Sequence, residues 1–250
     1  MNTLLTLIGA SLIGLSLGLT GAGGSIITLP VLVYLAAIPA REAVGMSLFV
    51  VGAAALAGAI QRFRAGDFHP SAALMFSLSG MAGATLGARL TPLLPAAVLM
   101  MLFALLMLGV ALKMLLSSGR EPVVPAECRP ARCLLAGFGV GVLTGFIGVG
   151  GGFLLVPALI QFARLPVRTA TGTSLAIIAF NSAAGFLSHL HDAPLRWPLM
   201  LLFASLAVAG TWIGSLFAKR LPVRRLQQTF AVLVLFTGSY VLWQNFHSMA

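Results

Sequence analysis

The chain has 250 residues, of which 59% are hydrophobic and only 8% are charged, with a formal net charge of +10. A soluble domain carries roughly a quarter charged residues, so this composition excludes a water-soluble globular protein and predicts an integral membrane protein. At about 20 apolar residues per crossing, the chain holds about eight membrane segments and little extramembrane domain. Its 15 Lys and Arg are scattered in short loops, which argues against nucleic acid as a partner and favours a role in membrane topology.

The first predicted element, residues 3–37, is a membrane segment broken by glycines. Its central stretch reads GLTGAGGSIITLP over 18–30. We expect the run from Gly18 to Gly24 to unwind the chain and a new helix to begin near Ser25 or Ile26. The segment lacks the basic n-region of a signal peptide and recurs later in the chain, so we expect it to belong to the mature protein.

Apolar runs then predict three spans at 43–62, 71–90 and 95–116, which complete an N-terminal repeat, 1–117. A polar linker, 118–131, is predicted to be cytoplasmic. The C-terminal repeat, 132–250, starts with a second broken segment at 132–164, which contains GFIGVGGGFLLVP over 145–157. Its predicted spans are 170–189, 196–217 and 223–246.

The two repeats align without a gap when the chain is shifted by 127 residues. Between positions 14 and 58, 16 of the 45 residues are identical to those 127 positions later. They include glycines, prolines and an arginine, which a shared apolar composition alone would not align. AVGMSL at 43–48 overlays ATGTSL at 170–175. Gly83 and Gly87 coincide with Gly210 and Gly214, a spacing that predicts close helix packing. The pattern indicates an internal duplication.

The topology depends on whether the broken segments cross the membrane. If each crosses once, the 15 Lys and Arg divide about evenly between the two sides, and the positive-inside rule then predicts no orientation. If each makes no net crossing, by re-entering or by crossing twice with short helices, twelve fall on one side and three on the other. The twelve are Arg62, Arg64, Lys113, Arg120, Arg129, Arg132, Arg164, Arg168, Lys219, Arg220, Arg224 and Arg225. This asymmetry makes the basic side cytoplasmic and predicts a multi-pass protein of the bacterial inner membrane with both termini periplasmic.

With three net crossings per repeat, the second repeat enters the membrane from the opposite face. The predicted fold class is therefore an all-α integral membrane protein of two inverted-topology repeats. Each repeat is a Gly-broken helical hairpin plus three transmembrane helices. Inverted repeats are common in secondary transporters, because they provide two similar conformations open to opposite sides.

The glycine breaks are the predicted substrate site. Backbone amides inside a bilayer need partners in the protein or in a water-filled cavity. A helix starting at each break points unpaired N–H groups and its positive dipole end at the break, which favours an anion. We expect no Lys or Arg deep inside any span, so the anion would depend on backbone amides and hydroxyl groups. The alternative is that the glycines only allow close packing and the hydroxyls bond back to their own helices.

The candidate substrate-binding residues are Thr20, Gly21, Gly23, Gly24, Ser25, Ser47, Gly148, Gly150, Gly151, Gly152, Thr173, Ser174 and Asn181.

The sequence does not favour nucleotide binding, catalysis or metal binding. Neither glycine run ends in the Lys-Ser or Lys-Thr of a P-loop, and neither follows a strand as in a dinucleotide-binding unit. The histidines are expected to lie at the rim of the membrane segments, so neither an enzyme nor a cofactor is expected. Cys128 and Cys133 have no second Cys pair or His nearby, so no metal site is predicted.

Two motifs carry a family resemblance. Gly-x-x-Gly-x-Gly-Gly followed by Pro, and A-x-G-x-S-L about a dozen residues later, each occur twice. The chain resembles the sulfite exporter TauE/SafE family over essentially its whole length. The resemblance implies a bacterial inner-membrane permease or exporter for sulfite, sulfoacetate, other sulfonates or related organic anions. The first repeat departs from the second at Ser25, which aligns with Gly152, and at Met46, which aligns with Thr173.

The remaining expectations concern coupling and partners. Asp67 with His69, and His189 with His191 and Asp192, occupy near-equivalent turns and can exchange protons near pH 7, although a helix-end role is the alternative. A negative cell interior already favours export of an anion. The alternative function is an anion channel or a non-transporting structural membrane subunit. Expected partners are a small anionic substrate and the lipid bilayer, and a homo-oligomer is left open.

Overall fold

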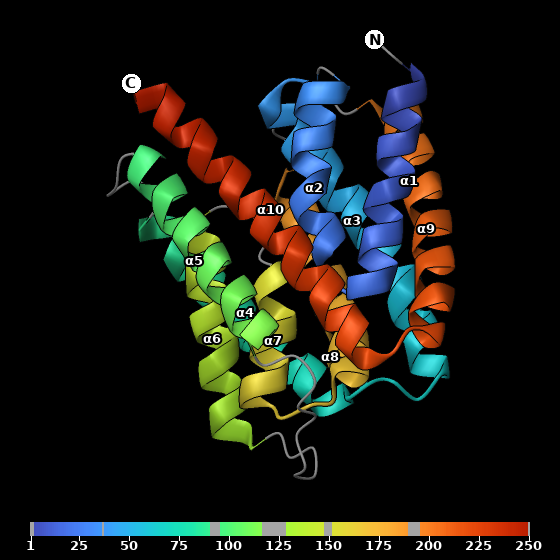
Figure 1. Ribbon diagram of the computed structural model, residues 1–250, viewed down its shortest axis with the longest axis vertical. Coiled ribbons are helices and arrows are strands. Elements are labelled where there is room, and N and C mark those ends of the chain that lie inside the picture. The colour runs from blue at the N-terminus through green and yellow to red at the C-terminus, as the bar shows by residue number, and fades with distance from the viewer. Residues whose placement is uncertain are drawn as a thin grey trace.

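The computed structural model describes residues 3–36, 38–90, 96–116, 129–147, 152–189 and 196–249 (Figure 1). These residues are almost entirely helical and include no strand, which confirms the all-α class. Three helical stretches among them are long and apolar enough to cross a membrane: Glu42–Arg64, Val167–Leu187 and Trp197–Ala218. Leu7–Thr20 and Pro130–Leu143 are shorter apolar stretches.

The N-terminal half begins with two short helices that run in opposite directions (Figure 1). Helix α1 (Thr3–Thr20) descends from the top of the view, and α2 (Gly23–Pro30) returns upward and continues into the π-helix η1 (Val31–Leu35). Three long helices follow, which are α3 (Ala40–Arg64), α4 (Pro70–Leu90) and α5 (Ala96–Leu116).

The C-terminal half has the same order of elements. Helix α6 (Pro130–Ile147) begins at the bottom of the view, two residues before the predicted repeat boundary, and α7 (Gly152–Phe162) follows it. The three long helices of this half are α8 (Val167–His189), α9 (Trp197–Arg220) and α10 (Val223–Met249). Helix α1 begins and α10 ends at the top of the bundle, so the two ends of the described chain lie on one side (Figure 1).

The first helix of each half packs lengthwise on a helix of the other half. Helix α1 lies along α9, and α6 lies along α4. Small residues make these approaches close: a Cβ on Gly14 would collide with the Ala207 carbonyl, and one on Gly141 with the Gly80 carbonyl. Gly83, Gly210 and Gly214 likewise face the backbone of the partner helix, as their spacing predicted.

Helices α3 and α8 pack against each other in the centre, and α5 packs on α10. Phe49 of α3 meets Phe186 of α8 with ring centroids 5.2 Å apart. The outer faces carry large exposed apolar side chains, such as Trp212 of α9 and Phe236 of α10, which are 60% and 75% exposed. An apolar outer surface of this kind suits lipid as the surrounding solvent.

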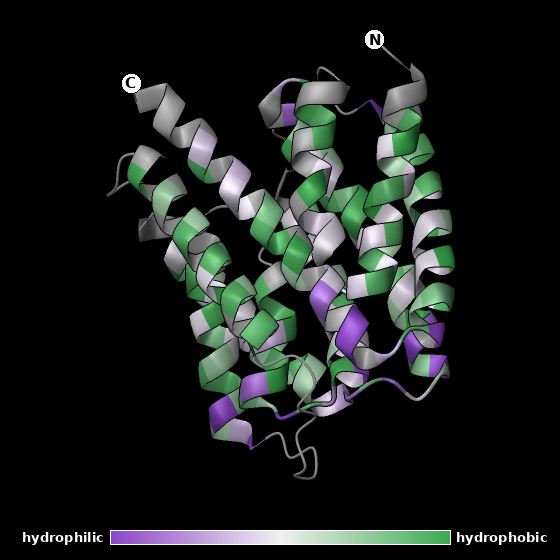
Figure 2. Cartoon of the chain, viewed as in Figure 1, coloured by the Kyte–Doolittle hydropathy of each residue, from purple (hydrophilic) through white to green (hydrophobic). Residues whose placement is uncertain are grey.

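Hydrophilic residues gather at one end of the bundle. Figure 2 shows them mainly at the bottom, where α3 and α9 end and where α6 and α10 begin. Helix α3 ends with Arg62 and Arg64, and α9 ends with Arg220. The predicted gathering of basic residues on one side therefore holds for these helix ends.

Candidate functional site

The first glycine break is a tight turn at Gly21 and Ala22, between α1 and α2. Gly21 has a φ of +78°, which residues with a Cβ rarely adopt, and its N–H donates to the Leu17 carbonyl at 2.8 Å. Helix α2 then begins at Gly23, two or three residues before the predicted start. It starts early because Gly23 and Gly24 are themselves helical once Gly21 has reversed the chain.

Thr20 satisfies one of the amides that this new helix start exposes. Its Oγ1 accepts from the Gly23 N–H at 2.9 Å and donates to the Ser16 carbonyl at 2.7 Å. The Ser25 hydroxyl bonds back to the Ala22 carbonyl at 2.7 Å. Thr20 is therefore part of the turn itself, and the N–H groups of Gly24 and Ser25 are the first-turn donors without an acceptor inside α2.

Helix α8 holds the break in place through Thr171 and Ser174 of the motif ATGTSL. The Ser174 hydroxyl lies within hydrogen-bond distance of the Gly21 carbonyl at 3.0 Å and of the Thr171 carbonyl at 2.8 Å. A Cβ on Gly21 would come within 2.5 Å of the Thr171 methyl and 2.9 Å of Ser174 Oγ. The structure thus places Ser174 at the first glycine break, and its role in substrate binding stays a prediction.

Thr173 points elsewhere. Its Oγ1 accepts from the backbone N–H of His69 at 3.1 Å, in the turn between α3 and α4. Beside it, Gly172 lets the carbonyl of Asp67 approach so closely that a Cβ would collide with it. The motif therefore joins two loops, with Ser174 on the glycine break and Thr173 on the α3–α4 turn.

The starts of α2 and α7 meet. A Cβ built on Gly152, the first residue of α7, would lie 2.5 Å from Ser25 Oγ. Two predicted site residues from opposite halves are thus in contact. Gly148, Gly150 and Gly151 lie outside the described residues.

Two further candidates lie away from the first break. Ser47 bonds back to the Val44 carbonyl at 2.8 Å, and its neighbour Leu48 packs against Gly185, about three helical turns along α8 from Ser174. Asn181 lies two turns beyond Ser174, and its Oδ1 is buried without a hydrogen-bond partner in the described part of the chain.

Sequence reasoning missed Arg62. We expected it to act as a topology determinant at the end of a span, and no basic side chain to lie deep in one. Instead Arg62 is fully buried, because the end of α1 and the α3–α4 turn cover it. Its Nη2 donates to the Gly18 carbonyl at 3.3 Å, and its Nη1 forms an ion pair with Asp67 at 3.6 Å.

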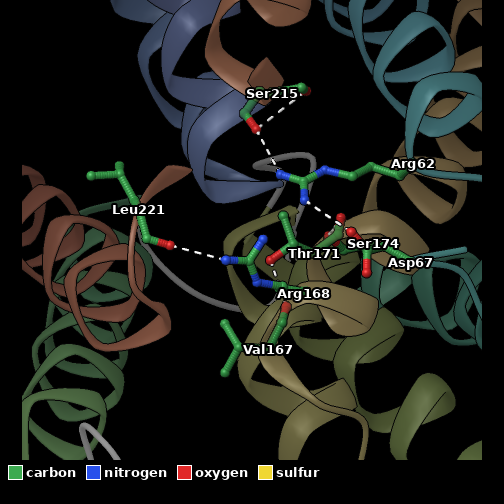
Figure 3. Close-up of polar contacts among 9 residues, drawn as sticks. Arg62, Asp67, Val167, Arg168, Thr171, Ser174, Ser215 and Leu221 are labelled. Atoms are coloured by element: carbon green, nitrogen blue, oxygen red, sulfur yellow. Dashed lines mark hydrogen bonds and ion pairs between the residues drawn. The ribbon is translucent and has the colours of Figure 1, made fainter. Parts of the chain in front are cut away.

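Figure 3 shows this group, which we call the Arg62 cluster: Arg62, Asp67, Arg168, Thr171 and Ser174 around the end of α1. The Gly18 carbonyl also lies 3.4 Å from the Ser215 hydroxyl, and Arg168 donates to the Leu221 carbonyl at 3.1 Å. One signal in the sequence could have indicated this burial.

Arg62 and Arg64 lie about 200° apart around a helix, on nearly opposite faces. If one face of α3 packs against other helices, one of the two side chains lies on that buried face.

The described residues contain no group of three or more His, Cys, Asp and Glu that could hold a metal. What the site offers is a glycine break, two helix starts in contact and a buried guanidinium. Together with the apolar helices and outer surface, these features define a multi-pass helical membrane protein with a polar site at a broken helix.

Comparison with known proteins identifies its family. The sequence model of the sulfite exporter TauE/SafE family matches residues 6–241, and the chain belongs to this family. It is 32% identical to a probable membrane transporter protein of Xylella fastidiosa, with 100% of this chain and 98% of that protein aligned. It is 23% identical to the probable membrane transporter protein YunE of Bacillus subtilis, with 92% and 93% aligned. No solved structure matches.

Proposed function

We propose that the protein is a secondary transporter that exports a small sulfur-containing or organic anion, such as sulfite, sulfoacetate or another sulfonate, by alternating access. The observation that carries the proposal is the contact between the starts of α2 and α7, where Ser25 meets Gly152. Helix starts direct unpaired N–H groups and positive dipole ends at one place, which favours an anion between them. The family and its probable membrane transporters support the transport function.

The anion site of this proposal consists of the first turns of α2 and α7 with the glycines before them. In this proposal Gly24 and Ser25 contribute backbone donors on one side and Gly152 contributes them on the other, and Gly150 and Gly151, which lie outside the described residues, stay sequence-based candidates. Ser174 shapes the site through the Gly21 carbonyl. Asn181, with its buried and unpartnered Oδ1 among the described residues, lines the continuation of the path along α8.

We infer two inverted repeats, 1–117 and 132–250, joined by a cytoplasmic linker at 118–131. The contacts between the halves support this arrangement. Gly14 packs against Ala207, and their equivalents 127 residues away, Gly141 and Gly80, also pack together. Helix α1 begins at the top of the view and its equivalent α6 at the bottom (Figure 1). A two-fold axis in the membrane plane relates such halves and gives two similar conformations.

We also propose that the basic end faces the cytoplasm and that both termini are periplasmic, in the bacterial inner membrane. Fusing a reporter that is active only in the periplasm to each terminus tests this. Activity at both termini is the expected result. An inactive reporter at either terminus, with a cytoplasm-active reporter working there, would refute the orientation.

Flux into proteoliposomes tests the transport itself. We expect sulfite or a sulfonate to cross with a rate that saturates with concentration. A rate that rises linearly to high concentration would instead assign an anion channel, and no flux of any oxyanion would favour a structural membrane subunit.

The site is tested separately by replacing Gly23 or Gly150 with Val. Each change is expected to abolish flux, because a branched side chain fills the space at a helix start, while the protein still inserts in the membrane. Full flux by both variants would assign the glycines to packing alone.

A further inference from the structure

Arg62 has more hydrogen-bonding capacity than its surroundings use. A guanidinium carries five N–H donors. Gly18 accepts one of them, from Nη2 at 3.3 Å. Nε has no hydrogen-bond partner in the described ranges, and Nη1 has only the ion pair with Asp67. Buried polar groups in proteins are nearly always paired, and an unpaired buried charge is costly, so these donors call for a ligand.

The ion pair with Asp67 does not use these donors fully. Charge-assisted hydrogen bonds between nitrogen and carboxylate oxygen are usually about 2.7–2.9 Å long. The 3.6 Å between Arg62 Nη1 and Asp67 Oδ2 is well beyond this range. The Asp67 side chain is also 24% exposed, whereas that of Arg62 is fully buried. Asp67 is therefore a loose counter-ion at the solvent boundary.

The donors of the guanidinium suit an oxyanion. It offers two edges that can bind two oxygen atoms at once, Nε with Nη2 and Nη1 with Nη2. Because Nη2 carries two N–H groups and Gly18 takes one, one edge keeps both of its donors. Sulfite and sulfonates present three oxygen atoms on one sulfur, so two of them can face this edge.

The surroundings add charge and position. Arg168 belongs to the same cluster, where its guanidinium is directed at the Leu221 carbonyl and its charge acts on Arg62 (Figure 3). The residues of the cluster thus include two cations and the single carboxylate of Asp67. Arg62 also touches the chain three residues before the Gly21 turn, through the Gly18 carbonyl. An anion on Arg62 is thus next to the first glycine break, at the basic end of the bundle.

We propose that Arg62 binds the transported oxyanion at the basic end of the bundle, where the anion replaces Asp67 as the counter-ion and then passes to the glycine break. This inference rests on the proposed transport of an oxyanion. It adds a charged docking residue to a site that sequence reasoning had built from backbone and hydroxyl groups alone.

Four variants of the full chain test the docking role: Arg62→Gln, Arg62→Lys, Asp67→Asn and, as the matched control, Arg64→Gln. Arg64 is exposed on the same helix, so its variant removes the same charge without touching the cluster. Two measurements are made with sulfite as the probe. They are the half-saturating concentration for flux into proteoliposomes and the stabilisation of the purified protein against thermal unfolding.

Arg62→Gln is expected to raise the half-saturating concentration at least about tenfold, the effect of losing a charge-assisted hydrogen bond. Arg62→Lys keeps the charge but not the two-donor edge. Its half-saturating concentration should lie between those of Arg62→Gln and the unchanged chain. Asp67→Asn removes the competing carboxylate and should lower the half-saturating concentration. Arg64→Gln should leave it within about twofold, as expected for an exposed charge.

The opposite signs of the Arg62 and Asp67 effects separate docking from a structural ion pair. If Asp67→Asn weakens sulfite binding as much as Arg62→Gln does, the pair is structural and the proposal is wrong. If Arg62→Gln does not fold, the Asp67→Asn result alone decides. If sulfite binding depends on Arg62 but no flux is measured, the docking site is upheld and transport is refuted. If flux is saturable but is unchanged in the Arg62 and Asp67 variants, transport is upheld and the docking site is refuted. A chain that neither binds nor moves sulfite would overturn both.

Discussion

The two ends of α3 each carry an ion pair, and the two pairs differ in burial and completeness. At the start of the helix, Glu42 meets Arg196 Nε at 3.0 Å, and the Arg196 side chain is 55% exposed. At the other end, Arg62 is fully buried and lies 3.6 Å from Asp67. This pair is short and reaches solvent only through Arg196, since the Glu42 side chain is 10% exposed, and it joins the starts of α3 and α9. The buried pair leaves N–H donors of Arg62 without a hydrogen bond among the described residues. Unused donors of this kind suit a ligand-binding residue, whereas a structural ion pair is short and complete.

The largest expected effect comes from the backbone beside the buried pair. Gly21→Ala forces a side chain into a left-handed conformation, which costs roughly 1–2 kcal/mol, and adds a collision with Thr171. We expect loss of the folded hairpin, seen as aggregation on size-exclusion chromatography or a lower unfolding temperature in detergent. The matched control is Gly109→Ala in α5, where a Cβ would meet nothing within 4 Å. Equal behaviour of the two variants would remove the special role of Gly21.

An intermediate effect is expected where α8 holds the α3–α4 turn. Thr173→Val keeps the shape but removes the acceptor of the His69 N–H, and an unpaired amide of this kind costs about 1–3 kcal/mol. The unfolding temperature should fall, and the half-saturating concentration for flux should change because the turn positions Asp67. Thr173→Ser retains the hydroxyl and should recover most of the loss. No difference between Val and Ser would show that this hydrogen bond contributes nothing.

The smallest effect is expected at the exposed pair. Arg196→Gln removes the charge but leaves an amide N–H that can donate to the largely buried Glu42 carboxylate, so stability should fall by only about 1 kcal/mol and sulfite flux should stay unaltered. Thermal unfolding and flux are measured on the same preparation as Arg62→Gln. If Arg196→Gln impairs flux as strongly, the contrast between the two ends of α3 fails.

Much of the helical layout could be predicted from the sequence, because apolar length and glycine breaks act locally. The helices α3 to α5 and α8 to α10 each match a predicted span to within about three residues at either end. The direction of a hydroxyl group was not predictable in the same way, since it depends on the neighbour that folding supplies. Thr173 and Ser174 are adjacent in one motif, yet one binds the α3–α4 turn and the other the glycine break.

The burial of Arg62 escaped prediction for a related reason. By composition it belongs to the basic end of a span, where Lys and Arg usually reach solvent. The side chain is enclosed only in the folded chain, where the end of α1 brings the Gly18 carbonyl to it and the α3–α4 turn brings Asp67. Contacts between residues so far apart in sequence leave no periodic trace in either segment.

The crossed pairing of α1 with α9, and of α6 with α4, has a consequence for biogenesis. Helix α1 is synthesised before the surface it packs on, which begins at Trp197. Until then its small-residue face has only lipid or a chaperone to contact. We therefore expect the packing of α1 on α9 and of α4 on α6 to form only after the C-terminal half has been inserted.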